Sequence, residues 1–146
     1  IALPARETFA LLTAVLVAFG STRPWSRTSG ELFNGDIEVT YVNGISGDGQ
    51  ATLALGILAG VLILWRLLRR RSSGVVLGAA ILVLGIAGLV GMFNWSEIDR
   101  IPGIYRGTED YFRFGFQPGW GLIVVTVAGL AGAGVLAYQM WTDNFR

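Results

Sequence analysis

"ATLALGILAGVLILWRLLRRRSSGVVLGAAILVLGIAGLVGMFNW", residues 51–95, consists of two apolar runs on either side of a short arginine-rich joint. The runs cover 51–68 and 74–95, and each is close to the roughly 20 residues that an α-helix needs to cross a hydrocarbon core of about 30 Å. Neither run has an ionisable residue near its centre. The stretch therefore predicts two transmembrane helices joined by a tight turn on one side of a membrane.

Two further apolar runs flank this pair, a shorter one at residues 8–25 and a longer one at 119–141. Four runs of this kind are typical of a polytopic membrane protein. The sequence thus predicts an all-α membrane protein, a four-transmembrane-helix bundle that forms a single domain over residues 1–146. Its outer loops are predicted at 26–50 and 96–118.

The composition supports this class and excludes several kinds of chemistry. Only 14% of the 146 residues are charged, whereas soluble domains carry about 25%. The chain has no cysteine and no histidine, and all eleven cationic side chains are arginine, so thiolate and imidazole metal sites and Schiff-base catalysis are excluded. We therefore expect a protein that is not an enzyme and has no metal or other cofactor, although a bound lipid or other hydrophobic molecule would fit between its helices.

The arginine-rich joint, residues 69–73, predicts the orientation of the chain. Cytoplasmic loops accumulate arginine, and no acid lies nearby to balance it. An even number of spans then places both termini in the cytoplasm, in a protein of the cytoplasmic membrane. The same cations would also bind anionic lipid headgroups, since membrane lipids are their nearest partners. They are Arg66, Arg69, Arg70 and Arg71.

All five tryptophans fall at predicted span ends, where the indole ring prefers the headgroup level of a bilayer. Pro24 precedes the first of them and is expected to mark the exit of the first span. The predicted interface anchors are Trp25, Trp65, Trp95, Trp120 and Trp141.

The first outer loop contains a strand signal. In "IEVTYV", residues 37–42, Ile37, Val39 and Tyr41 alternate with Glu38 and Thr40, which is typical of a half-buried strand. Asn34-Gly35 favours a type I′ turn, with a short partner strand at residues 31–33. We expect a small β-hairpin or sheet over the bundle, with an ordered loop as the alternative.

The second outer loop interleaves aromatic side chains with arginine and acidic residues. Such interleaving can stack nucleobases, but this loop is acidic on balance and is predicted to lie outside the cell, so no nucleic acid is expected. Enrichment in tyrosine and arginine is also typical of protein-binding surfaces. The predicted partner contact consists of Tyr105, Tyr111, Phe112, Phe114 and Phe116.

The turn Gly47-Asp48-Gly49 precedes the second run and offers too few ligands for calcium, because Asp48 is its only carboxylate. A phosphate-binding loop of the Gly-rich, lysine-containing type is excluded because the chain has no lysine. The simpler interpretation is that the Asp48 carboxylate caps the second helix by accepting hydrogen bonds from its first backbone N–H groups.

Small residues recur at helical spacing in the last three runs, and such spacing lets helix backbones approach each other closely in lipid. The glycines predicted to pack helices could do so within the bundle, or against copies of the chain or a larger complex. They are Gly56, Gly60, Gly74, Gly78, Gly85, Gly88 and Gly132.

Three short motifs carry a resemblance that covers most of the chain: Pro24-Trp25, Gly47-Asp48-Gly49 and Gly119-Trp120-Gly121. Their order resembles that of small uncharacterised bacterial four-span membrane proteins of the actinobacterial type. The resemblance implies four helices and no known activity, and the long aromatic second outer loop departs from it. The layout is also similar to that of claudin-type proteins by architectural analogy alone, since the expected disulfide pair is absent.

Two function hypotheses follow. The first is a non-catalytic integral membrane subunit that docks on a larger membrane protein complex and stabilises it. The alternative is a stand-alone small membrane protein that binds a lipid, quinone or pigment between its helices, or an envelope protein that assembles with copies of itself.

Overall fold

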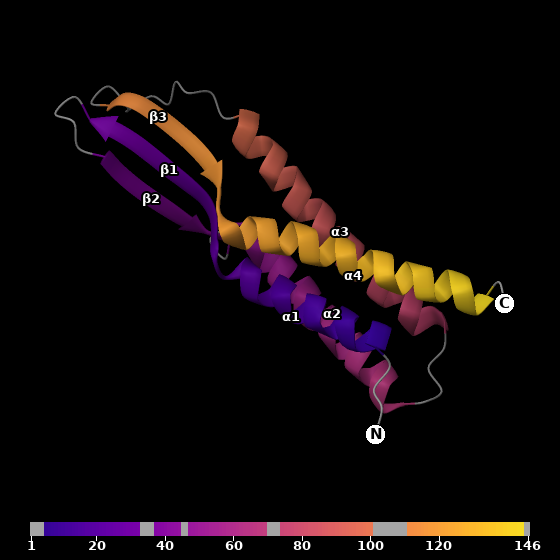
Figure 1. Cartoon of the computed structure of the whole chain (residues 1–146). Coiled ribbons are helices and arrows are strands. Elements are labelled where there is room, and N and C mark those ends of the chain that lie inside the picture. The colour runs from indigo at the N-terminus through magenta and orange to yellow at the C-terminus, as the bar shows by residue number, and fades with distance from the viewer. Residues whose placement is uncertain (1–4, 33–36, 45–46, 70–73, 101–110, 145–146) are drawn as a thin grey trace.

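Helices occupy all four apolar runs in the computed structural model, which describes residues 5–32, 37–44, 47–69, 74–100 and 111–144. These residues form four helices and three strands (Figure 1). In chain order the elements are α1 Ala5–Ser21, β1 Pro24–Leu32, β2 Ile37–Asn43, α2 Gly49–Leu68, α3 Gly74–Arg100, β3 Tyr111–Pro118 and α4 Trp120–Asn144.

Three of the helices are long and apolar enough to cross a membrane, over the stretches Gly49–Leu68, Gly74–Ser96 and Trp120–Thr142. These stretches identify a membrane protein and agree with three of the predicted spans. The first predicted span differs, because α1 has 17 residues and ends at Ser21. Pro24 and Trp25, expected at the exit of that span, begin β1 instead.

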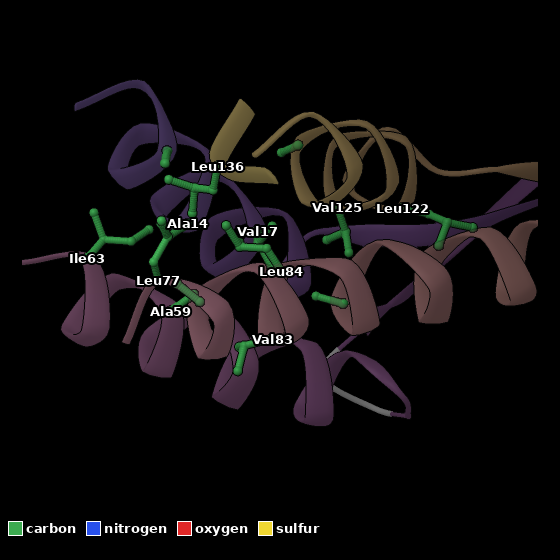
Figure 2. Close-up of a cluster of buried hydrophobic side chains, with 14 of the residues drawn as sticks. Ala14, Val17, Ala59, Ile63, Leu77, Val83, Leu84, Leu122, Val125 and Leu136 are labelled. Carbon is green, nitrogen blue, oxygen red and sulfur yellow. The ribbon is translucent and has the colours of Figure 1, made fainter. Parts of the chain in front are cut away.

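The helices form a ring in which α1 and α3 each lie mainly against α2 and α4. Their shared core is made of small and medium-sized side chains, among them Ala14 of α1, Ala59 of α2, Leu84 of α3 and Val125 of α4 (Figure 2). Small core residues allow close helix approach, and dispersion contacts then hold the helices together.

The outer surface of the bundle carries the larger apolar side chains. On α1, for example, Phe9, Leu12, Val15 and Phe19 are exposed while Ala10 is completely buried. A water-soluble bundle shows the opposite arrangement, with polar residues outside. The exterior of the bundle is therefore suited to contact with the hydrocarbon core of a membrane.

A three-stranded antiparallel sheet extends from the end of the bundle opposite both termini (Figure 1). Its order is β2-β1-β3, so β1 is central and pairs Thr28 with Thr40 on one side and with Phe116 on the other. The predicted partner strand at 31–33 was too short, since β1 begins at Pro24, and β3 was not predicted as a strand. Residues 33–36, with the predicted type I′ turn, lie outside the described residues.

Candidate functional site

A junction of close backbone contacts joins the sheet to the bundle. β1 follows α1 after two residues, and β3 leads into α4 through Gly119. The Trp25 indole N–H donates to the Gly20 carbonyl oxygen at 3.0 Å, and the Gly119 N–H donates to the Trp25 carbonyl oxygen at 2.8 Å. The Gly44 N–H also donates to the Arg23 carbonyl oxygen at 3.0 Å. The sheet is therefore held to α1 and α4 by hydrogen bonds, not by a free linker.

Trp25 thus has a different role from the one predicted. It is buried, and its indole N–H points into the junction instead of toward headgroups. Its ring also covers Gly44, where any side chain would collide with the indole. Trp25 is a structural residue of the junction and not an interface anchor.

The other four tryptophans lie nearer the surface. Trp65, Trp120 and Trp141 are about half exposed, whereas Trp95 is partly buried against the core. Each exposed indole has an aromatic or cationic neighbour: Arg69 lies over Trp65 at 4.8 Å, Phe19 lies 5.8 Å from Trp120, and Tyr138 lies 6.4 Å from Trp141. Their predicted place at the headgroup level stays a prediction.

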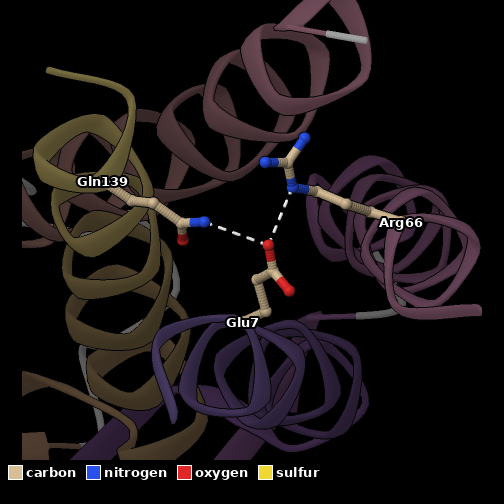
Figure 3. Close-up of polar contacts among 3 residues, drawn as sticks. All are labelled: Glu7, Arg66 and Gln139. Carbon is tan, nitrogen blue, oxygen red and sulfur yellow. Dashed lines mark hydrogen bonds and ion pairs between the residues drawn. The ribbon is translucent and has the colours of Figure 1, made fainter. Parts of the chain in front are cut away.

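A buried polar cluster joins three helices at the end of the bundle where the chain starts and finishes (Figure 3). The Glu7 carboxylate of α1 accepts from Arg66 Nε of α2 at 2.8 Å and from Gln139 Nε2 of α4 at 3.0 Å. The Glu7 side chain is 9% exposed and that of Arg66 16%. Within the described part of the chain, Gln139 Oε1 is buried without a hydrogen-bond partner.

Sequence reasoning missed this cluster, although an acid in the first turn of α1 and an arginine in the last turn of α2 were the available signal. The partners are 59 and 132 positions apart. The cluster also changes the interpretation of Arg66, which was predicted to face the cytoplasm and lipid headgroups. The Arg66 Nε–H donates a hydrogen bond to the Glu7 carboxylate, whereas Arg69 is exposed and lies over the Trp65 ring. Arg70 and Arg71 lie outside the described residues.

Asp48 occupies the predicted N-cap position of α2, but the predicted capping contact is wrong. Its side chain makes no capping hydrogen bond, because its backbone is already helical, with φ −61° and ψ −16°. One carboxylate oxygen instead accepts from Asn94 Nδ2 of α3 at 2.9 Å. Asp48 therefore links two helices at the sheet end of the bundle.

This contact predicts a small effect for Asp48→Ala. The hydrogen bond is exposed to solvent, so its loss should lower the free energy of unfolding by less than about 1 kcal/mol. Asn94→Ala should have an effect of similar size, and the double variant should cost no more than the larger single one. Unfolding in mixed micelles measures all three. Fully additive losses would contradict a shared contact.

The predicted packing glycines divide into two groups. A Cβ at Gly56 would lie 2.9 Å from the Ala18 backbone nitrogen, and one at Gly88 would lie 2.8 Å from Leu130 Cγ. Gly132 lies against Thr13, and Gly129 against Gly88. These glycines allow close helix crossings within the bundle, as glycine does in lipid.

The remaining predicted glycines do not make such crossings. A Cβ at Gly60 or Gly85 would only reach ordinary contact, at 3.9 Å from Ala14 Cβ and Ala133 Cβ. At Gly74 and Gly78 it would meet nothing within 4 Å. Gly60 and Gly85 therefore face a neighbouring helix without a close crossing, and Gly74 and Gly78 contact no other described helix of the bundle. The alternative, that they pack against copies of the chain or a larger complex, stays a prediction.

Two apolar grooves run along the outside of α4. The α1–α4 groove has a volume of about 350 Å³ and is lined by Phe9, Leu12, Thr13, Leu16, Ile123, Val124, Val127, Ala128 and Ala131. The α3–α4 groove has a volume of about 380 Å³ and is lined by Ile81, Leu82, Gly85, Ile86, Leu89, Ala133, Gly134 and Ala137. Both have large exposed apolar side chains in their lining, but only the second includes glycine, at Gly85 and Gly134.

The aromatic residues of the second outer loop belong in part to the sheet. Phe114 and Phe116 stand in β3 opposite Gly30 and Thr28 of β1, and Tyr111 and Phe112 begin the strand. Tyr105 lies outside the described residues. The pairing places the predicted partner contact on an edge strand, and the contact itself stays a prediction.

The described residues contain no group of three or more His, Cys, Asp or Glu side chains that could hold a metal ion. Comparison of the chain with models of protein families and with curated protein sequences finds no match. The resemblance to actinobacterial four-span proteins therefore stays a prediction, and a function has to be inferred from the grooves, the polar cluster and the sheet.

Proposed function

We propose that the chain is a non-catalytic integral membrane subunit that spans the cytoplasmic membrane four times and docks on a transmembrane helix of another subunit through the α3–α4 groove. The outer sheet, closed by a hairpin turn between β1 and β2, would lie over the complex on the outer side.

The side-chain pattern of α1 supports a fourth span. At 1.5 Å per residue, its 17 residues are about 25 Å long, slightly less than a typical hydrocarbon core. Its exposed face carries Phe9, Leu12, Val15, Leu16 and Phe19 along that length. Exposure of so many large apolar side chains favours contact with lipid over contact with water.

The distribution of arginine supports termini in the cytoplasm. Arg6, Arg66 and Arg69 all belong to the end of the bundle where α1 begins and α2 ends. Four of the eleven arginines of the chain fall within residues 66–71, around the short joint between α2 and α3, whereas the five on the longer outer segments are accompanied by eight acidic residues. A dense arginine cluster on a short loop favours the cytoplasmic side for that loop. The sheet then faces outward.

The observation that carries the docking proposal is the division of glycines on α3 and α4. Gly88 and Gly129 face inward at the α3–α4 crossing, whereas Gly85 and Gly134 line the outer groove. A Cβ at Gly134 would meet nothing within 4 Å. Small residues on a lipid-facing groove let a further helix approach closely and gain dispersion contacts. A helix is therefore the occupant that this groove fits best.

Gly134→Leu tests the proposal, because the new side chain occupies the groove while its Cβ meets no atom of the bundle within 4 Å. The chain is extracted gently from native membranes, and native mass spectrometry shows what travels with it. The wild-type chain should carry a larger subunit in fixed stoichiometry, and Gly134→Leu should lose about nine-tenths of it, as expected when a packed helix contact costs about 1.4 kcal/mol. Ala54→Leu is the matched control, since Ala54 is an exposed small residue on α2, outside the groove.

Retention of the partner by Gly134→Leu would show that the groove is not the docking surface. A wild-type chain that emerges alone, or only with copies of itself, would overturn the accessory-subunit proposal and favour a self-assembling protein instead.

A further inference from the structure

The α1–α4 groove differs from the docking groove in having no glycine in its lining, whereas the docking groove has Gly85 and Gly134. Phe9, Leu12 and Leu16 form one wall, and their side chains are 44%, 54% and 37% exposed. Without a glycine between such side chains, another helix backbone cannot approach the groove closely. A thin, flexible chain can still lie between them. The groove therefore suits an acyl chain better than a helix.

The floor of this groove offers no polar group to an occupant. Thr13 is its only polar lining residue, and the Thr13 hydroxyl donates to the Ala10 carbonyl oxygen at 2.6 Å within α1. Ala128, also on the floor, is nearly completely buried. An occupant of the groove is thus held by apolar contact alone along its length.

A cation lies at the sheet end of the groove. The row of Phe9, Leu12 and Leu16 continues along α1 to Phe19, about one helical turn or 5 Å further on. There the Arg23 guanidinium lies 4.6 Å from the Phe19 ring centroid, and the Trp120 ring is 5.8 Å from the same ring. The ion pair recorded among the described residues joins Arg66 to Glu7, so Arg23 has no carboxylate partner there.

The opposite end of the groove is less suited to a headgroup. Arg6 lies there, but its guanidinium already donates to Thr142 Oγ1 at 3.2 Å and lies over Tyr138. On α4, Tyr138 lies seven positions beyond the last lining residue, Ala131, which is about 10 Å of helix. At the sheet end the corresponding gap from Ile123 to Trp120 is three residues, or about 5 Å.

We propose that the α1–α4 groove binds one acyl chain of an anionic phospholipid whose phosphate lies against Arg23. Guanidinium and phosphate form paired, charge-assisted hydrogen bonds, and stacking on Phe19 pre-orders the guanidinium plane. The Trp120 ring, beside Phe19, covers the glycerol region between phosphate and chain. This site is separate from the α3–α4 docking groove.

Native mass spectrometry of the purified full chain in detergent tests the site, with phosphatidylglycerol or phosphatidylcholine of the same acyl chains added in turn. We expect one tightly bound phosphatidylglycerol. Ala131→Phe, which fills the groove, should weaken the binding of both lipids about tenfold. Arg23→Gln should weaken the binding of phosphatidylglycerol about tenfold and that of phosphatidylcholine less, because the choline cation already partly neutralises the phosphate of phosphatidylcholine.

Two controls match these variants. Ala54→Phe adds the same bulk to an exposed position on α2, and Arg69→Gln removes an exposed arginine that lies 4.8 Å over Trp65 without a groove beside it. Both should bind lipid as the wild-type chain does. Val127→Trp, at an exposed lining position, replaces Ala131→Phe if that variant unfolds.

Three results would overturn the proposal. The first is that the wild-type chain binds no more of either lipid than the Ala131→Phe variant does. The second is an equal loss of phosphatidylglycerol in Arg69→Gln and Arg23→Gln, which would indicate general attraction to cations. The third is weaker phosphatidylglycerol binding by Ala131→Phe with unchanged binding by Arg23→Gln. That result would mean that the groove binds an acyl chain but that Arg23 does not bind the phosphate.

Discussion

Replacing Gly129 by alanine is expected to lower the free energy of unfolding by about 3 kcal/mol, at the upper end of the cost of overpacking a core. A Cβ there would lie 2.7 Å from the Gly88 nitrogen, 2.8 Å from Gly88 Cα and 2.9 Å from the Leu84 carbonyl oxygen. All three atoms belong to the α3 backbone, so no side chain can rotate away. α3 and α4 must separate, and core contacts around Leu84 are lost with them.

Gly134→Ala is the matched control on the same helix, because its new methyl group would meet nothing within 4 Å. Alanine has the higher helix propensity, so this variant should be neutral or slightly more stable than the wild type. Denaturant unfolding in mixed micelles, followed by circular dichroism, compares the two. Equal stabilities of Gly129→Ala and Gly134→Ala would rule out the tight crossing of α3 and α4.

Replacing Glu7 by alanine is expected to cost about 3 kcal/mol, the lower part of the range for breaking a buried ion pair. The loss leaves Arg66 Nε without its acceptor and removes the acceptor of the Gln139 amide N–H. The lower part of the range is appropriate because Arg66 lies in the last turn of α2 and can extend toward water. Since Glu7 contacts two other helices, the whole end of the bundle should loosen.

The double variant Glu7→Leu with Arg66→Met distinguishes a buried arginine that has lost its carboxylate from a simple loss of packing. It removes both charges and keeps apolar volume, so much of the stability lost in Glu7→Ala should return. Glu7→Gln is a second comparison, since it preserves shape and one acceptor oxygen. If the double variant were as unstable as Glu7→Ala, the ion pair would not be the source of the effect.

The helical part of the fold could be predicted from the sequence because a membrane span is a local property. Length and apolar composition alone identify α2, α3 and α4. The sheet was harder. Phe112, Phe114 and Phe116 alternate with Arg113 and Gln117, which is a strand signal, but strand pairing with β1 joins residues that are nearly ninety positions apart.

The candidate sites depend on which neighbour each residue faces, and the spacing of residues along a helix does not give that neighbour. Gly85 and Gly88 are three residues apart on α3, yet one lines the outer groove and the other packs against Leu130. Glu7 and Gln139 meet only because α1 and α4 are neighbours in the ring. The hydrophobic pattern could not show this, because in lipid both the core and the exterior of a bundle are apolar.

The central position of β1 has a consequence for how the molecule is made. During synthesis β1 and β2 are made early, but the second edge of β1 stays unpaired until residues 111–118 have been made. An unpaired edge is open to pairing with another chain. The sheet is therefore completed only when the segment just before the last helix is made. A chain that ended after α3 would expose the unpaired edge of β1 to strand pairing with other chains.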